Sequence, residues 1–237
     1  MLFFYVRHGD PIYIPDSLTP LGERQAEAAA HRLATFGIDK IYASTSTRAM
    51  LTAKPTCELV RKELTTLDFC NESHAWNQLA VVENERRMWL FQNAKARQTL
   101  VSPELLALGE NWTEHPDFAA YPFREGIERI RRESDAFFLS LGYEHIPGTG
   151  AYRCVAPTEE RVALFAHQGF GLAFLSCLLD IPYPRFVVHF DMNHTGITAI
   201  DFKEEGGIAI PRVLTLSNDS HLYEAHLPLD YNHEFRF

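Results

Sequence analysis

Two short apolar runs, far apart in the chain, constrain the fold most strongly. One is Leu2–Val6, and the other is RVALFA at residues 161–166. A strand with one face in water alternates apolar and polar residues, whereas these runs offer apolar residues to both faces. That pattern is typical of parallel strands covered by helices on both sides. Each run ends at side chains suited to chemistry: Arg7 and His8 follow the first, and His167 follows the second.

Helical and strand patterns alternate between these two runs. Thr19 and Pro20 predict the N-cap and the first residue of a helix that continues to about residue 36. A short strand is expected at 38–44, and a second helix follows it. Residues 127–145 predict another helix that returns to the core, because their apolar residues recur at helical spacing.

Further elements follow the second apolar run. Residues 168–180 predict an apolar helix, residues 196–202 an edge or antiparallel strand, and residues 211–219 the last strand. Strands that alternate with helices favour a sheet with helices packed on its faces. The fold class predicted is therefore α/β, a three-layer α/β/α architecture with a mostly parallel central sheet.

The middle of the chain has a different character. Residues 71–132 interleave aromatic side chains with charges and prolines, among them Trp76, Trp89 and Trp112. A packed set of short helices accounts for this composition better than a cofactor site does. We expect a single domain over residues 1–237, with residues 71–132 forming an inserted helical cap region.

Composition excludes several classes of partner. The chain has 237 residues and a formal net charge of -9 at pH 7, which disfavours nucleic acid as a partner. Four cysteines occur without C-x-x-C spacing, which indicates reduced thiols and a cytoplasmic location. The apolar start is too short for a signal peptide, and no later stretch has the length of a membrane span, so no membrane partner is expected. The oligomeric state is left open.

Four side chains are expected to meet at one edge of the sheet. Arg7 and His8 follow the first strand, Arg48 lies at a helix start after the strand at 38–44, and His167 follows the second apolar run. Ligands of open α/β sheets bind outside the carboxyl ends of the strands. Arginines present fork-shaped donors to phosphate oxygens, and helix N-termini add backbone N–H groups. The expected ligand is a phosphoryl group.

Two imidazoles in such a site indicate catalysis. One can attack phosphorus and the other can stabilise the developing charge, while a carboxylic acid protonates the leaving oxygen. The chain contains neither a Walker A glycine loop nor an H-E-x-x-H motif, so we expect no metal and no cofactor. His189 and His194 are five residues apart, which does not suit a metal pair, and they are interpreted as structural or pocket-lining.

Three segments resemble signature segments of a known family. They are YVRHGD at 5–10, YASTSTRAMLTA at 42–53 and LFAHQGFG at 164–171. Together they are similar to the histidine phosphatase superfamily, with its RHG motif and phosphoglycerate-mutase-like fold. The segment HTGITAIDF, at 194–202, also resembles the late strand of that family. The resemblance implies that His8 is the nucleophile.

The same resemblance implies the roles of the other side chains. Arg7 and Arg48 would clamp the phosphate, and His167 would be the second imidazole in contact with it. The acid of the family is usually a Glu after the third strand, often in an L-x-E context that this sequence does not reproduce. The candidates here are Glu72, Glu83 and Glu85, given by their positions in the chain.

Glu72 is favoured among the three because it lies closest to the end of a weak strand expected at 64–69. Tyr13, in the loop after His8, and Gln168, next to His167, are candidates for substrate binding. Tyr13 suits a turn equally well.

The function expected is that of a histidine acid phosphatase-like phosphoric monoester hydrolase. It would hydrolyse a small-molecule phosphate ester, a small organic phosphate, without metal and through a phosphohistidine intermediate. One alternative is a phosphoglycerate-type mutase, although the middle of the chain is aromatic and irregular where the mutases of the family carry paired basic residues. The other is a non-catalytic module of the same fold that binds a phosphorylated ligand.

Overall fold

A six-stranded sheet forms the centre of the computed structural model, which describes residues 1–231. Residues 232–237, included in the predicted domain, lie outside the described residues. In order across the sheet, the strands are β14 (Arg212–Asn218), β11 (Ile197–Asp201), β1 (Leu2–Arg7), β10 (Arg161–Ala166), β4 (Lys40–Ser44) and β5 (Leu64–Leu67).

The sheet is mostly parallel, as predicted. Strand β1 pairs in parallel with β10, β10 with β4, and β4 with β5. Strands β11 and β14 run antiparallel to their neighbours. The strand expected at 196–202 is therefore antiparallel, and it lies inside the sheet between β1 and β14 rather than at an edge.

Strand β1 supplies apolar side chains to both faces of the sheet. Successive side chains of a strand point to opposite faces. Phe3 and Tyr5 accordingly pack in one hydrophobic cluster, and Phe4 and Val6 pack in another on the opposite face. All four side chains are fully buried, which accounts for the continuous apolar run at the start of the sequence.

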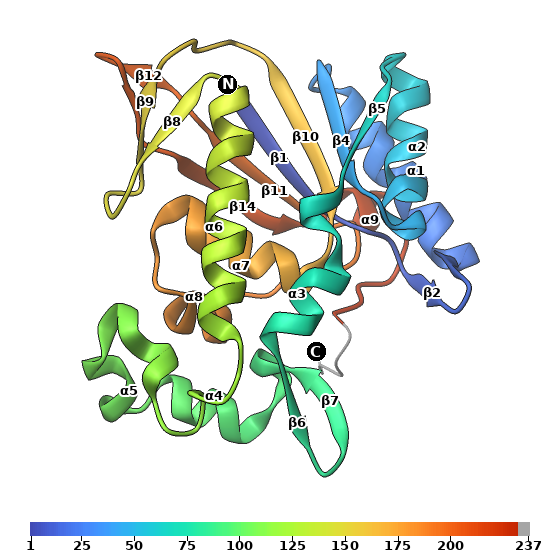
Figure 1. The fold of residues 1–237 in the computed structure, drawn as a ribbon. Coiled ribbons are helices and arrows are strands. Elements are labelled where there is room, and N and C mark those ends of the chain that lie inside the picture. Colours follow the sequence, from blue (N-terminus) through green and yellow to red (C-terminus); the bar gives the residue numbers. More distant parts are fainter. Residues whose placement is uncertain (232–237) are drawn as a thin grey trace.

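Helices cover both faces and complete the three-layer α/β/α fold predicted from the sequence (Figure 1). One face carries α1 (Pro20–Ala34) and α2 (Thr47–Val60), with α9 (Ser220–Glu224) against α1. The other carries α6 (Phe123–Ser140) and α7 (Gln168–Leu179), with α8 (Tyr183–His189) against α7. Helix α1 begins at the predicted cap, where the Thr19 hydroxyl accepts from the Gly22 N–H at 3.0 Å.

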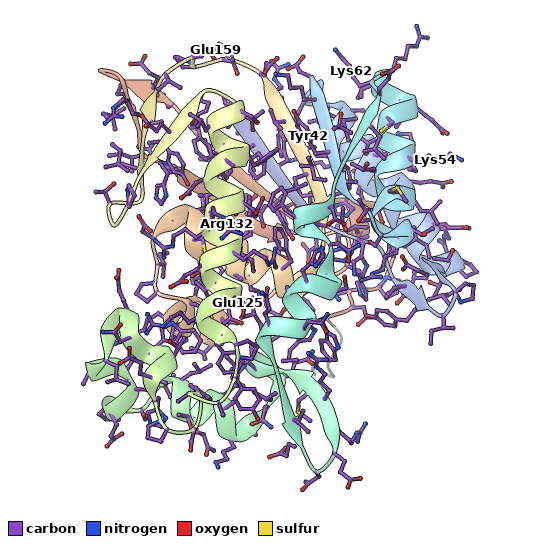
Figure 2. All side chains as sticks on the ribbon, in the orientation of Figure 1. Tyr42, Lys54, Lys62, Glu125, Arg132 and Glu159 are labelled. Atoms are coloured by element: carbon purple, nitrogen blue, oxygen red, sulfur yellow. The ribbon has the colours of Figure 1, made fainter. Side chains whose placement is uncertain are left out.

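Helix α6 shows how one amphipathic helix separates core from solvent. Phe137 and Phe138 pack inward against Phe3, with ring centroids 6.2 and 5.3 Å away. Glu125 and Arg132 lie on its exposed side (Figure 2). The predicted end of the cap region, residue 132, falls inside this helix.

The segment between β5 and α6 consists of short elements near one end of the sheet (Figure 1). They are η1 (Asp68–Cys70), α3 (Glu72–Leu79), the hairpin β6 (Ala80–Glu83) and β7 (Arg86–Trp89), η2 (Leu90–Gln92), α4 (Ala94–Leu100), α5 (Pro103–Ala107) and η3 (Gly109–Glu114). Aromatic rings pack between these elements and α6, as where Trp112 of η3 stacks on Phe123 of α6 with ring centroids 5.8 Å apart. That residues 71–132 act as a cap stays a prediction.

Smaller sheets flank the core. The hairpin of β8 (Tyr143–Ile146) and β9 (Ala151–Cys154) continues into β13 (Ile208–Ala209) and β12 (Glu204–Glu205), and β2 (Pro11–Tyr13) pairs with β3 (Asp16–Leu18). All four cysteines are free thiols. Across residues 1–231, no helix has both the length and the apolar character needed to cross a membrane.

An ionic cluster around the buried His145 side chain ties α6, β8 and the end of α7 together. His145 Nδ1 lies 2.8 Å from Asp135 Oδ1, and its Nε2 lies 3.0 Å from Asp180 Oδ2. Arg131 donates to the other oxygen of Asp180 at 2.9 Å. Because carboxylates accept, both ring nitrogens donate and the imidazole is cationic. Burial lowers the pKa of His145, but Asp135 and Asp180 outweigh it, and the pKa is raised above 6.5.

We predict that His145→Gln lowers the free energy of unfolding by roughly 3 kcal/mol near pH 6, because it removes the cation from the largely buried Asp180 and the half-buried Asp135. Since the folded-state pKa is raised, the contribution is complete below the unfolded-state value of 6.5 and is lost as pH rises through the folded-state pKa. Urea unfolding of both proteins should therefore show a difference that shrinks as pH rises through the folded-state pKa of His145. A difference independent of pH would mean that His145 is uncharged.

Candidate active site

The register of two parallel strands brings the two central histidines together. Arg7 of β1 pairs with Ala166 of β10, so the next residues, His8 and His167, leave the sheet side by side. The His8 N–H also bonds the Ala166 carbonyl at 2.9 Å. The ring centroids of His8 and His167 are 5.2 Å apart.

The imidazole of His8 has a defined tautomer. Its Nδ1 lies 2.7 Å from the carbonyl oxygen of Gly9, which can only accept, so Nδ1 carries the proton. The lone pair is then on Nε2. Burial, followed by the charges of His167, Arg7 and Arg48, holds the pKa of His8 well below its usual range. His8 is a neutral imidazole with a nucleophilic Nε2.

His167 is fixed by its ring and by its backbone. Nε2 lies 2.8 Å from the Ser44 hydroxyl, and Nδ1 lies 3.2 Å from Arg48 Nη2, which can only donate. Nδ1 therefore accepts, and Nε2 carries the proton. Tyr5 holds the backbone, because its hydroxyl donates to the His167 carbonyl at 2.6 Å and accepts from the His167 N–H at 3.1 Å. Burial, then Arg48 and Arg7, lower the pKa of His167 well below 6.5.

Arg7 is a cation buried at the base of the site, with 1% of its surface exposed. Nη1 donates to the Met192 carbonyl at 2.5 Å, and Nη2 donates to His194 Nε2 at 2.8 Å. Its Nε has no hydrogen-bond partner within residues 1–231, and the same holds for the Nε of Arg48. Buried guanidinium donors without partners favour an anion. Burial is also what lowers the pKa of Arg7.

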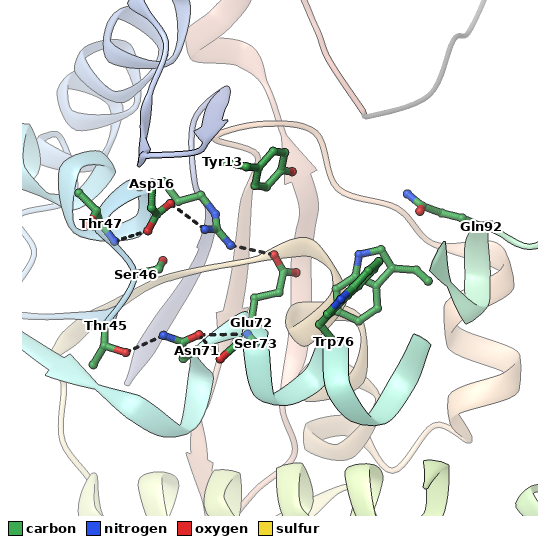
Figure 3. Close-up of a pocket in the computed structure, with 12 residues that line it drawn as sticks. Tyr13, Asp16, Thr45, Ser46, Thr47, Asn71, Glu72, Ser73, Trp76 and Gln92 are labelled. Carbon is green, nitrogen blue, oxygen red and sulfur yellow. Dashed lines mark hydrogen bonds and ion pairs between the residues drawn. The ribbon is translucent and has the colours of Figure 1, made fainter. Parts of the chain in front are cut away.

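Arg48, in the first turn of α2, links β3 and α3 through two acidic side chains. Nη1 bonds Asp16 Oδ1 at 2.8 Å, and Nη2 bonds Glu72 Oε2 at 3.2 Å (Figure 3). Its guanidinium lies 5.4 Å from the centroid of the Tyr13 ring. The second predicted arginine is therefore held in place by two carboxylates.

The structure places Glu72 beside His167 and the start of α7. Glu72 is the first residue of α3, and the Asn71 side chain caps that helix by accepting from the Ser73 N–H at 3.0 Å. Glu72 Oε1 accepts from the Gly169 N–H at 3.0 Å, and Oε2 lies 3.4 Å from His167 Nδ1. Burial raises the pKa of Glu72 above 4.5, against the lowering effects of Arg48 and Arg7.

The other two acid candidates lie elsewhere. Glu83 and Glu85 are exposed on the β6–β7 hairpin. The two candidates for substrate binding also differ from each other. Tyr13 lines the cavity next to the site, whereas the Gln168 amide is buried and donates to Asp191 Oδ1.

His194 belongs to the site, although its spacing from His189 gave no functional pattern. Its Nε2 accepts from Arg7 at 2.8 Å, so the proton is on Nδ1. Nδ1 faces two carboxylates, Asp230 Oδ2 at 3.5 Å and Asp10 Oδ1 at 3.8 Å. Burial, then Arg7, lower the pKa of His194 to about 2. The one indication in the sequence that His194 lies near His8 is its position shortly before β11, the strand that pairs with β1.

Within residues 1–231, two groups of side chains bring metal-ligand atoms within 4.8 Å of one another: His8, Glu72 and His167, and Asp10, His194 and Asp230. Neither fits a cation well. The first lies against the guanidinium groups of Arg7 and Arg48. In the second, the His194 nitrogen that faces the carboxylates carries a proton and has no lone pair to offer.

A cavity of about 730 Å³ opens next to Glu72 (Figure 3). The residues that line it are Tyr13, Asp16, Thr45, Ser46, Thr47, Arg48, Asn71, Glu72, Ser73, Trp76, Trp89 and Gln92. The cavity lies between the β2–β3 hairpin, the start of α2 and the segment that contains α3 and β7. It is large enough for an organic group attached to a phosphate.

Comparison with known proteins gives a family match and a shared fold. The family model of the histidine phosphatase superfamily (branch 1) matches residues 5–133. No curated protein matches the chain.

Solved structures resemble nearly the whole chain. A phosphoserine phosphatase from Entamoeba histolytica, in complex with 3-phosphoglyceric acid, has a TM-score of 0.62 and 16% identity, covering 93% of this chain and 98% of that one. A mycobacterial glucosyl-3-phosphoglycerate phosphatase has a TM-score of 0.58 and 18% identity, with coverages of 91% and 98%. At these identities the likeness shows the fold.

We predict that His194→Ala weakens phosphate binding roughly tenfold or more, because a hydrogen bond to a buried charged group is lost and Arg7 keeps, among the described residues, only its bond to the Met192 carbonyl. His194→Gln should retain most of the affinity, because its side-chain oxygen can reach the position of Nε2. Calorimetric titration with inorganic phosphate measures the effect, and thermal melting checks that each variant folds. Equal losses in the Ala and Gln variants would contradict a role for His194 in holding Arg7.

Proposed function

The chain belongs to the histidine phosphatase superfamily, and from that premise we propose that it hydrolyses small organic phosphate monoesters through a phosphohistidine on His8. It would be a metal-independent, histidine acid phosphatase-like enzyme. The observation that carries the proposal is the tautomer of His8. Its proton is held by the Gly9 carbonyl, and its Nε2 lone pair stands within a group of arginines, a second imidazole and a carboxyl group.

In the first step, His8 Nε2 attacks phosphorus, the P–N bond forms and the ester P–O bond breaks. Arg7 and Arg48 stabilise the charge on the phosphoryl oxygens. The negative charge of the phosphoryl group opposes the effect of these arginines on His167 and favours its protonated form, which can then donate to an oxygen. Glu72 gives its proton to the leaving oxygen.

In the second step, water replaces the alcohol. Glu72, now a carboxylate, takes a proton from water, the resulting hydroxide attacks phosphorus, and the P–N bond breaks. Inorganic phosphate leaves, and His8 and the Glu72 acid are restored. The same carboxyl group thus acts as acid and then as base.

Two other functions remain to be separated by experiment. A phosphoglycerate-type mutase would transfer the phosphoryl group to a second hydroxyl of its substrate or product, with little release of inorganic phosphate. A non-catalytic module would be protected against thermal unfolding by phosphate esters but would release no phosphate. Steady phosphate release from an ester, in the presence of a chelator, distinguishes the hydrolase from both.

We predict that Glu72→Gln lowers kcat on an alkyl phosphate by roughly 10²–10⁴-fold, as expected for loss of a general acid. The loss should be much smaller on p-nitrophenyl phosphate, whose leaving group needs no proton, when the first step limits the rate. Glu83→Gln and Glu85→Gln are matched controls that should retain turnover, and His8→Ala should have none. Full turnover by Glu72→Gln on the alkyl ester would refute the assignment of the acid.

The pH dependence of turnover should follow from the protonation of His8 and Glu72. The pKa of His8 is lowered, so the nucleophile stays neutral into the acidic range. The pKa of Glu72 is raised, and the acid form is lost as pH rises through it. We therefore expect kcat/KM for an alkyl phosphate to be highest at acidic pH and to fall toward alkaline pH, and Glu72→Gln to lack that fall. An alkaline optimum in the wild-type protein would contradict this scheme.

A further inference from the structure

The cavity beside the phosphate site has room for a substantial leaving group. Its volume is about 730 Å³, which lies in the range of pockets that enclose organic ligands. Ser46, Arg48 and Glu72 are among its lining residues. A group bonded to the phosphate would therefore occupy this cavity next to the proposed acid.

Trp76 lies one helical turn after Glu72. Residues four apart on a helix share a face, and both side chains line the cavity. Figure 3 shows the Glu72 carboxyl group and the Trp76 ring side by side on α3. Because Glu72 gives its proton to the leaving oxygen, the carbon group on that oxygen would lie against Trp76.

The Trp76 ring is held from several sides. It forms an edge-to-face pair with the ring of Trp89, with centroids 4.9 Å apart and planes at 77°. The Arg87 guanidinium lies 5.4 Å from the Trp76 ring centroid and donates to the Trp76 carbonyl at 2.8 Å. A ring fixed in this way loses little conformational entropy when a ligand packs on it.

The Trp76–Trp89 pair is also packed against the N-terminal end of α7, next to His167. Trp89 packs so closely on Gly169 that a Cβ there would lie 2.5 Å from Trp89 Cη2. Gly169 is the residue whose N–H bonds Glu72. Tyr13 offers another ring, 58% exposed, at the end of β2. The cavity thus presents fixed aromatic surface close to the reacting atoms.

The charges of the cavity oppose a second anion. Among the described residues that line it, Arg48 is the one cation, and it already bonds Asp16 and Glu72. A carboxylate on the leaving group would lie near the Asp16 carboxylate, and no further cation lines the cavity among the described residues. A second negative charge close to Asp16 is unfavourable in a partly buried site.

From this cavity, and on the basis of the proposed phosphatase function, we infer that the preferred substrates are phosphate monoesters of uncharged, ring-bearing alcohols. The ring packs on Trp76 while Glu72 protonates the ester oxygen. Small esters with a carboxylate, such as phosphoserine, are poor substrates.

Three esters of primary alcohols test the inference: benzyl phosphate, propyl phosphate and 4-carboxybenzyl phosphate. Their leaving groups are chemically similar, so differences in kcat/KM report on the ring and on the added charge. The kcat/KM for benzyl phosphate should be roughly tenfold or more above that for each of the other two esters. This is the size expected for an aromatic contact or for an unpaired charge.

Variants link these preferences to the cavity. Trp76→Ala should lower the benzyl-to-propyl ratio of kcat/KM toward one, whereas Trp76→Phe should keep most of it. Gln92→Arg adds a cation to the lining and should raise kcat/KM for the 4-carboxybenzyl ester relative to that for the benzyl ester. Thermal melting checks the folding of each variant.

Two results would overturn the inference and leave the phosphatase function intact: an unchanged benzyl-to-propyl ratio in Trp76→Ala, or preference of the wild-type protein for the 4-carboxybenzyl ester. Absence of phosphate release from all three esters and from p-nitrophenyl phosphate would instead contradict the proposed function, and the inference with it.

Discussion

The active site depends on the register in which β1 and β10 pair. That register sets Arg7 opposite Ala166, so His8 and His167 leave the sheet together. Tyr5, two residues before Arg7, fixes the His167 backbone through two hydrogen bonds. Gly171 makes the contact possible, because a Cβ there would lie 2.5 Å from the Tyr5 hydroxyl. A shift of one residue would move every side chain of β1 to the opposite face and separate the pair.

Burial gives these groups their chemical character. Both imidazoles are neutral because desolvation and the nearby arginines disfavour the cation, and the pKa of Glu72 is raised because desolvation outweighs the arginines. These shifts suit a nucleophile, an acid and an anion site. Charged arginines remain buried because carbonyls, carboxylates and His194 satisfy their other N–H groups. The site is built to receive negative charge.

The sequence was sufficient for the parts of the site that follow strands directly. The sequence places Arg7, His8 and His167 at the carboxyl ends of two strands. In the structure these strands, β1 and β10, are parallel neighbours, so the three residues lie together. His194 could not be found this way, because its contact with Arg7 arises from the antiparallel placement of β11 inside the sheet. The bond between Gln168 and Asp191 joins the start of α7 to the loop after α8, a proximity that no periodicity encodes. Closeness to the end of the expected strand at 64–69 favoured Glu72 over Glu83 and Glu85, but the contacts of Glu72 with Arg48 and Gly169 depend on the path of the chain after β5.

The central claim is that His8 carries the phosphoryl group during turnover. The most direct test is to quench the wild-type protein during steady turnover of a phosphate ester under conditions that preserve phosphohistidine, and to locate the phosphoryl group by mass spectrometry. The account predicts a phosphoryl group on His8, which disappears once the substrate is consumed. Its location on another residue, or its absence while phosphate is being released, would contradict the account.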